Sequence, residues 1–277
     1  MFGIRQFRSE GFLSYIVYDR ALAAVLIDPR LDLMGDYREF LLERGLKPVW
    51  AVDTRLHADH PSAIHLVAGE FGVPNSHPPR KLKQGDRIEV GSLAFNVLTV
   101  SGPTEDSIAL YLEKAGDGRE GIVFSGEAAG QGLSDSLKKL PPSTLLFPAY
   151  CLGDLLFSTV KAELEGKEPL SPSSSIGVTK YALKLKEQGA GCLFLDVREP
   201  GEFQAGHMPG ARNMPLSEVA LHLDEISKAK RVYVSCLSGG RSLLAAKTLS
   251  YLGLPDVVNV TGGYRAWLQA ELPTEKG

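Results

Sequence analysis

Apolar and polar positions in the first part of the chain follow strand-like runs that come in pairs. Between them, residues 37–45 have helical spacing and stop at a glycine, and residues 49–54 form a further strand-like run. Strand pairs are predicted at residues 12–18 with 23–29, 86–91 with 93–100, and 108–112 with 121–125. Paired strands with helices between them favour a layered α/β domain.

A stretch rich in proline, serine and glycine interrupts this pattern and predicts a linker at residues 166–175. Beyond it, the spacing predicts helices at residues 178–189 and 243–253, and strands at residues 192–196 and 231–234. We therefore expect two domains, one formed by residues 1–165 and the other by residues 176–277.

The composition argues against several classes of protein. The chain has 277 residues, of which 44% are hydrophobic, and a net charge of −3 without any basic run, so a nucleic-acid partner is not expected. No apolar stretch is long enough to cross a membrane, and the N-terminus lacks a signal-peptide core. Three cysteines do not make a disulfide framework. Together these features predict a cytoplasmic protein with reduced thiols.

The clearest chemistry lies in the loop Ser-Cys-Leu-Ser-Gly-Gly-Arg-Ser at residues 235–242. Cys236 is predicted to lie between the end of a strand and the start of a helix, where backbone N–H groups and the helix dipole lower a thiol pKa. Arg241 adds a planar guanidinium that suits an oxyanion. This pattern predicts a nucleophilic cysteine that meets anionic substrates, and the alternative is a buried structural cysteine at a strand end.

Residues 236–241 resemble the active-site loop of rhodanese-type sulfurtransferases, and residues 193–203, 206–215 and 262–267 are similar to other motifs of that family. The resemblance implies an α/β domain with a parallel sheet, in which Cys236 is the catalytic residue. Four residues separate Cys236 from Arg241, the spacing that the family uses for sulfur. The substrate-binding residues that it implies are Leu237, Ser238, Gly239, Gly240, Arg241, Ser242, Asp196 and Arg198.

Three polar residues within these motifs also have a structural interpretation. The residues themselves favour a salt bridge between Asp196 and Arg198 that fixes the end of a strand, whereas the resemblance implies that both help to shape the pocket. His207 lies in a Pro-Gly turn, which indicates a structural hydrogen bond and not a general base. Cys192, on the strand at residues 192–196, is expected in the core.

The N-terminal part carries a second motif, Thr-Arg-Leu-His-Ala-Asp-His at residues 54–60. It resembles the metal-binding signature of the metallo-β-lactamase superfamily, and its flanks are most similar to the iron-dependent persulfide dioxygenases. Some of those enzymes are fused to a rhodanese domain in the same order. The resemblance implies an αββα sandwich.

Several ligand positions implied by this resemblance hold other residues, namely Arg55, Pro103 and Glu127. Arg55 brings a permanent positive charge that repels a cation, and proline has no side-chain donor. We therefore expect no metal and no cofactor, with Arg55 paired to Asp59 or Glu127. The remnant of the site consists of His57, Asp59, His60 and Glu127, and an alternative is zinc on His57, Asp59 and His60 alone.

These features predict a sulfurtransferase that moves sulfane sulfur from thiosulfate, a persulfide or a polysulfide, through a persulfide on Cys236, to a thiol or cyanide. Its N-terminal domain would be non-catalytic. Glutathione persulfide is one small-molecule partner expected, and related lactamase-fold proteins suggest a homodimer. Two alternatives remain, a sulfane-sulfur carrier or sensor whose N-terminal domain docks a partner protein, and an active iron persulfide dioxygenase fused to rhodanese.

Overall fold

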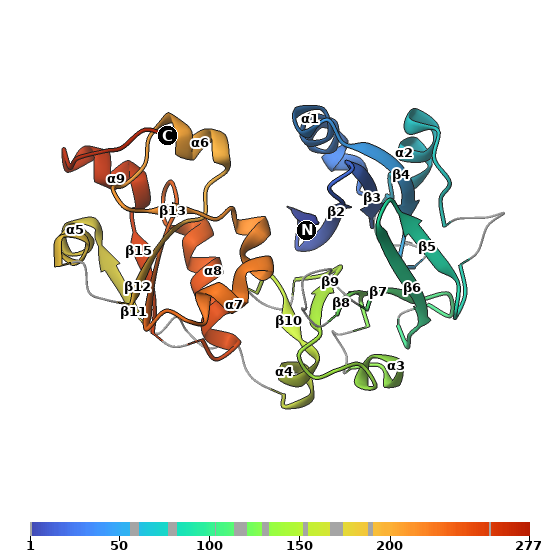
Figure 1. The fold of residues 1–277 in the computed structure, drawn as a ribbon. Helices are drawn as coiled ribbons and strands as arrows, with labels where there is room; N and C mark the ends of the chain where they lie inside the picture. The colour runs from blue at the N-terminus through green and yellow to red at the C-terminus, as the bar shows by residue number, and fades with distance from the viewer. Residues whose placement is uncertain are drawn as a thin grey trace. The chain divides into compact units, whose positions relative to one another are not determined.

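The computed structural model describes residues 2–55, 61–76, 82–102, 104–113, 121–128, 133–151, 155–166, 174–187, 191–254 and 256–277. The chain forms two compact units (Figure 1). The first consists of Met1–Leu152 and Phe157–Gly166, and the second of Gly153–Leu156 and Lys167–Gly277. None of the helices in these ranges combines the length and the hydropathy that crossing a membrane would require.

The first unit contains two β-sheets. One has the order β1-β2-β3-β4, formed by Gly3–Ser9, Phe12–Tyr18, Ala23–Ile27 and Lys47–Val52. The other has the order β10-β9-β8-β7-β6-β5, formed by Ser158–Thr159, Leu145–Pro148, Ile122–Gly126, Ile108–Leu112, Leu93–Thr99 and Arg87–Val90. Neighbouring strands are antiparallel except for β3 with β4 and β8 with β9.

The two sheets of the first unit pack face to face through aromatic side chains. The ring of Tyr15 in β2 lies 5.1 Å from that of Phe124 in β8 and 5.7 Å from that of Phe147 in β9. Apolar residues of α1 and α2 pack on the outer face of the first sheet, and those of α3 and α4 on the second. The helices of this unit are η1 (Leu31–Leu33), α1 (Met34–Arg44), α2 (Ile64–Phe71), α3 (Asp135–Lys138) and α4 (Val160–Leu164). The predicted αββα sandwich is confirmed.

The second unit is built on a parallel sheet with the order β11-β15-β14-β12-β13, as the resemblance implied. Its strands are Ser174–Gly177, Val257–Thr261, Arg231–Ser235, Cys192–Asp196 and Arg212–Asn213 in that order. Helices α7 and α8 lie on one face, with α5 and α9 on the other (Figure 1). The helices are α5 (Val178–Glu187), α6 (Pro200–Ala205), η2 (Leu216–His222), α7 (Leu223–Ile226), α8 (Gly240–Tyr251) and α9 (Gly263–Gln269).

Alternation along β14 explains how this sheet is covered on both sides. Val232 and Val234 pack with α8, whereas Tyr233 points to the opposite face and packs with α5 and α9. A strand that is buried on both faces has a continuous run of apolar residues, and this run allowed β14 to be predicted from the sequence.

Three details differ from the sequence predictions. Ser174 and Ser175, which the sequence placed in the linker, belong to β11 and pair with β15. The helix expected from residue 243 begins at Gly240, because Gly239 takes a φ of 101° that ends the loop and starts α8. Gly240, Arg241 and Ser242 therefore form its first turn. Cys192 is only partly buried, since β13 pairs with Leu195 and Asp196 and leaves the start of β12 flanked by β14 alone among the described strands.

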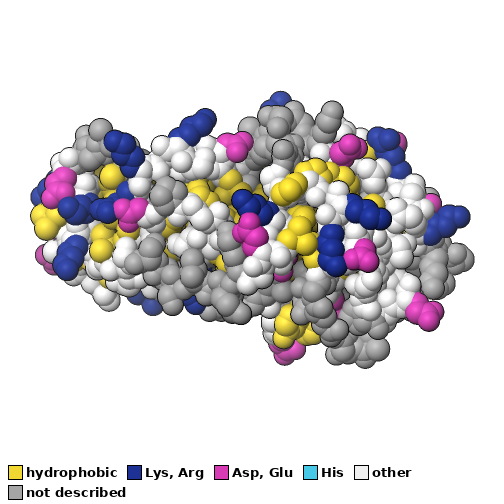
Figure 2. Space-filling view, turned by 90° about the horizontal axis from the view of Figure 1, so that it is seen from below, with side chains coloured by type: hydrophobic (Ala, Val, Ile, Leu, Met, Phe, Trp, Pro, Cys, Tyr) yellow, Lys and Arg dark blue, Asp and Glu magenta, His cyan; other side chains and the backbone are white. Residues whose placement is uncertain are grey.

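Charged side chains of both signs are mixed on the surface. On the face drawn in Figure 2, Lys and Arg side chains lie among Asp and Glu side chains, and its described part carries no continuous basic stripe. This mixture accords with the small net charge of −3.

Candidate functional site

The candidate site lies where β14 ends and α8 begins. Cys236 follows β14 directly, and its side chain sits at the base of the loop with only 1% of the residue exposed. The amide of Gly239 donates a hydrogen bond of 3.1 Å to its sulfur. The thiol thus faces backbone donors at the positive end of a helix of twelve residues.

The start of α9 holds the backbone of this loop. The amides of Tyr264 and Arg265 donate hydrogen bonds of 2.7 Å and 2.9 Å to the carbonyl oxygens of Cys236 and Leu237. Gly263 lies directly against the loop with a φ of 55°, and a Cβ atom there would stand 2.2 Å from the Cys236 carbonyl oxygen. Only glycine allows the two segments to approach so closely.

Ser242 joins the loop to the sheet. Its buried hydroxyl lies 3.1 Å from the carbonyl oxygen of Gly239 and 2.7 Å from the Oδ1 atom of Asn259 in β15. Sequence analysis missed Asn259, although a polar residue between valines in a buried strand signals a specific hydrogen bond.

The electrostatic surroundings of Cys236 favour the thiolate. Burial raises the pKa of the thiol, but the Ser242 hydroxyl and the amides of Ser242, Ser238 and Gly239 together outweigh it. The net result is a pKa below the usual range of a cysteine, which is the property that nucleophilic thiols need.

Arg241, whose guanidinium was expected to suit an oxyanion, is paired with a carboxylate of the protein. Its Nη1 and Nη2 atoms donate to both carboxylate oxygens of Glu202 at 2.6 Å and 2.8 Å. The hydrogen bonds between them raise the pKa of Arg241 and lower the pKa of Glu202. Glu202 lies in the first turn of α6, where it forms a capping box with Glu199. It belongs to the 193–203 motif, yet nothing in the sequence links it to Arg241.

Asp196 and Arg198 form a buried salt bridge at the end of β12, as the residues themselves favoured. Their exposed fractions are 1% and 2%, and Arg198 Nη2 lies 2.7 Å from Asp196 Oδ2. Arg198 also donates to the carbonyl oxygens of Glu202 at 3.1 Å and Gly206 at 2.8 Å, and it stacks 4.3 Å above the ring of Tyr264. The pair supports the segments around the loop from within the unit.

His207 has a structural role, as expected. Its Nδ1 atom lies 3.0 Å from the carbonyl oxygen of Phe203, and the two rings stack 3.7 Å apart. Backbone hydrogen bonds with Glu275 join it to the last residues of the chain.

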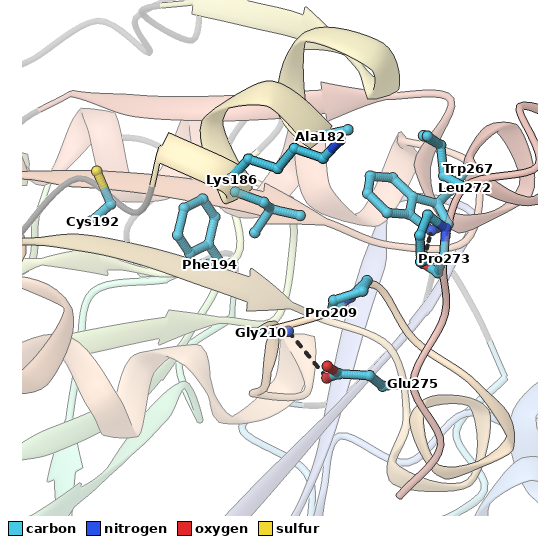
Figure 3. Close-up of a pocket in the computed structure, with 11 residues that line it drawn as sticks. Ala182, Lys186, Cys192, Phe194, Pro209, Gly210, Trp267, Leu272, Pro273 and Glu275 are labelled. Atoms are coloured by element: carbon cyan, nitrogen blue, oxygen red, sulfur yellow. Dashed lines mark hydrogen bonds between the residues drawn. The ribbon is translucent and has the colours of Figure 1, made fainter.

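A separate cavity of about 660 Å³ lies on the other face of the parallel sheet, between α5, α9 and the turn at residues 209–210 (Figure 3). Phe194 and Trp267 form part of its mostly apolar wall, and the carboxylate of Glu275 accepts a hydrogen bond from the Gly210 amide at 3.2 Å. Cys236 packs on the α8 side of the sheet, so this cavity is not part of the cysteine site.

In the first unit, Arg55 pairs with Glu127, one of the two partners expected for it. Nε and Nη2 of Arg55 lie 2.8 Å and 2.5 Å from Glu127 Oε1, and Arg55 is 6% exposed. A guanidinium bound to the carboxylate does not fit a metal site, because its positive charge repels any cation that the carboxylate would hold. Within the described ranges no group of three His, Cys, Asp or Glu residues could hold a metal. His57, Asp59, His60 and Pro103 lie outside those ranges.

Comparison with known proteins supports the assignment of the second unit. The family model described as "Rhodanese-like domain" matches residues 179–270. Thiosulfate sulfurtransferase 16, chloroplastic, from Arabidopsis thaliana is 38% identical over 98 residues, which are 31% of this chain and 82% of that protein.

Two Bacillus subtilis proteins are matched over shorter shares of their length. Uncharacterized protein YqhL is 45% identical over 73 residues, 26% of this chain and 58% of that protein. Putative sulfur carrier protein YrkF is 41% identical over 73 residues, 26% of this chain and 40% of that protein. The chain therefore spans about half the length of these two relatives.

Two solved structures are similar to this chain and support the fold of the first unit. ETHE1 from Myxococcus xanthus aligns with 58% of this chain and 80% of its own, with 27% identity and a TM-score of 0.51. A metallo-β-lactamase from Staphylococcus aureus aligns with 94% of this chain and 99% of its own, with 19% identity and a TM-score of 0.52, a likeness of fold. Through its second unit, which follows a first unit of metallo-β-lactamase fold, the chain belongs to the rhodanese family.

Proposed function

We propose that this protein is a sulfurtransferase that carries sulfane sulfur as a persulfide on Cys236, between a thiosulfate, persulfide or polysulfide donor and a thiol or cyanide acceptor. One observation carries the proposal: the Cys236 sulfur accepts the Gly239 amide at 3.1 Å, at the start of α8, and its pKa is lowered. A packing cysteine needs neither feature.

In the first half-reaction, the Cys236 thiolate attacks the outer sulfur of the donor. With thiosulfate, the donor sulfur–sulfur bond breaks, a new one forms to Cys236, and sulfite leaves with the electron pair. The amides of Ser238, Gly239 and Ser242, which face the Cys236 sulfur, stabilise the charge of the new persulfide anion.

In the second half-reaction, the acceptor attacks the terminal sulfur of the persulfide. Cyanide takes it as thiocyanate, and a thiol takes it as a new persulfide, so that Cys236 returns to the thiolate. This cycle requires a reduced thiol at rest, which accords with the free state of Cys236, and the proposal therefore includes a location in the cytoplasm.

The first unit has a non-catalytic role in this proposal. Arg55 and Glu127 neutralise each other where the resemblance implies metal ligands, so dioxygenase chemistry has no support from these two residues. An iron persulfide dioxygenase is the competing function, and the likeness to ETHE1 is what favours testing it.

A carrier or sensor is the second candidate, because one relative is named a putative sulfur carrier protein. In that case the Cys236 persulfide would pass to a partner protein and small acceptors would be turned over only incidentally.

Turnover decides between these candidates. Purified protein should convert thiosulfate and cyanide, or a persulfide and cyanide, to thiocyanate over many cycles. Cys236→Ser should abolish the reaction, whereas Cys192→Ser, which removes the partly buried thiol on the other sheet face, should retain it. Persulfidation of Cys236 without turnover would contradict the enzyme and support the carrier. Oxygen consumption with glutathione persulfide would support the dioxygenase.

A further inference from the structure

Arg241, the arginine of the cysteine loop, is shared among several charged groups. Arg241 and Glu202 are about equally exposed, 33% and 32%, so their bidentate pair lies where a substrate can reach it. Arg241 also interacts electrostatically with Cys236 and with Glu199. One guanidinium therefore serves two carboxylates and the reactive sulfur.

Arg198, a second arginine near the loop, is already paired with another carboxylate. Arg198 is buried in its pair with Asp196 and cannot turn toward a ligand without breaking that pair. A donor that needs Arg241 must therefore compete with Glu202, which holds both terminal nitrogens of the guanidinium at 2.6 Å and 2.8 Å.

The possible donors differ in how much they need that guanidinium. Thiosulfate brings two negative charges and releases sulfite, which also carries two. An organic persulfide carries at most one negative charge at its reacting end, and the thiolate that it releases carries one negative charge. In both cases the donor sulfur–sulfur bond breaks, a new one forms to Cys236, and the leaving group takes the electron pair.

We propose that Glu202 is a specificity-determining residue, which occupies Arg241 and thereby selects organic persulfides and polysulfides over thiosulfate as sulfur donors. The inference rests on the proposed function, since it concerns which donor reaches Cys236. In this proposal the Glu202 carboxylate in α6 disfavours a dianionic donor, although the backbone amides of the loop favour anions.

Glu202→Gln tests this directly, because glutamine has nearly the same size and still suits the third position of a capping box. The ratio of kcat/KM for thiosulfate to kcat/KM for glutathione persulfide, each with cyanide as acceptor, should rise about five- to tenfold. Glu187→Gln is the matched control, since it removes an equal charge from an exposed pair with Lys184 on α5. It should leave the ratio unchanged.

Mass-spectrometric detection of the Cys236 persulfide shows in each variant that the site is folded and reactive. An unchanged donor ratio in Glu202→Gln, with persulfidation intact, would overturn the selectivity inference and leave the sulfurtransferase standing. An equal loss with both donors would make Glu202 a positioning residue and also overturn it. A wild-type protein that no donor persulfidates would overturn the proposed function, and the inference with it.

Discussion

The amide nitrogen of Tyr264 lies 2.7 Å from the carbonyl oxygen of Cys236, so the first turn of α9 fixes the backbone of the proposed nucleophile. Gly263 makes this approach possible without touching the sulfur. The shape of the loop is therefore set partly by residues that carry no chemistry of their own.

Gly263→Ala should distort the loop, because its φ of 55° disfavours a side chain and the added carbon would overlap the Cys236 carbonyl oxygen. We expect a loss of about 2–4 kcal/mol in the free energy of unfolding of the second unit and a large fall in turnover. Urea unfolding followed by Trp267 fluorescence, in a Trp50→Phe background, measures the first effect.

Gly253→Ala is the control for Gly263→Ala, since Gly253 has a φ of 81° but open space around it. It should lose only about 1–2 kcal/mol and retain turnover. Equal losses in the two variants would show that the close contact with the loop is unimportant.

Ser242→Ala should make Cys236 less reactive near neutral pH. The lowered pKa of the thiol means that the thiolate predominates above that pKa and is lost as the pH falls through it. Loss of the hydroxyl donor raises the pKa of Cys236, so its alkylation by iodoacetamide at pH 7 should slow several-fold and the pH profile should move to higher pH.

Peptide mapping by mass spectrometry separates alkylation of Cys236 from that of the other two cysteines. Ser250→Ala, in the last turn of α8, is the matched control and should not move the profile. An unshifted profile in Ser242→Ala would assign the activation of the thiol to the backbone amides alone.

Arg198→Met should destabilise the second unit strongly, because it leaves the carboxylate of Asp196 buried without its counter-charge. The expected loss in the free energy of unfolding is about 3–5 kcal/mol, measured with Trp267 as above. Adding Asp196→Asn should recover part of it. Lys184→Met, which breaks an exposed pair with Glu187, should leave the unfolding midpoint unchanged, and a similarly small effect of Arg198→Met would contradict the role given to the buried pair.

Metal analysis should find no stoichiometric iron or zinc in the purified protein, since Arg55 and Glu127 neutralise each other. Elemental analysis by mass spectrometry measures this, with His57→Ala as comparison. Stoichiometric iron that disappears in His57→Ala would show a working metal centre and revive the dioxygenase.

The sequence predicts the strand, loop and helix around Cys236, the proposed nucleophile, because the signals for them are local. An apolar run ending at Ser235, small residues after Cys236 and helical spacing beyond them predict a strand, loop and helix without reference to the rest of the chain. The paired strands of the first unit were found for the same reason.

The residues that contact the loop of the proposed nucleophile were not predictable in this way. Glu202 and Arg241 are 39 positions apart, and Ser242 and Asn259 are 17 apart, so only the folded sheet brings each pair together. Helix α6, which carries Glu202, has six residues and too few turns for a periodic signal. Long-range pairing of this kind leaves no spacing for sequence analysis to detect.

The dependence of the loop on Gly263 and Asn259 limits how the nucleophile could be transplanted. A hexapeptide grafted from residues 236–241 onto another strand–helix junction would bring the thiol but lose the donors and the packing surface that orient its amides. Engineering this chemistry into a new scaffold therefore requires the carboxyl-terminal ends of β14 and β15 together with the beginning of α9.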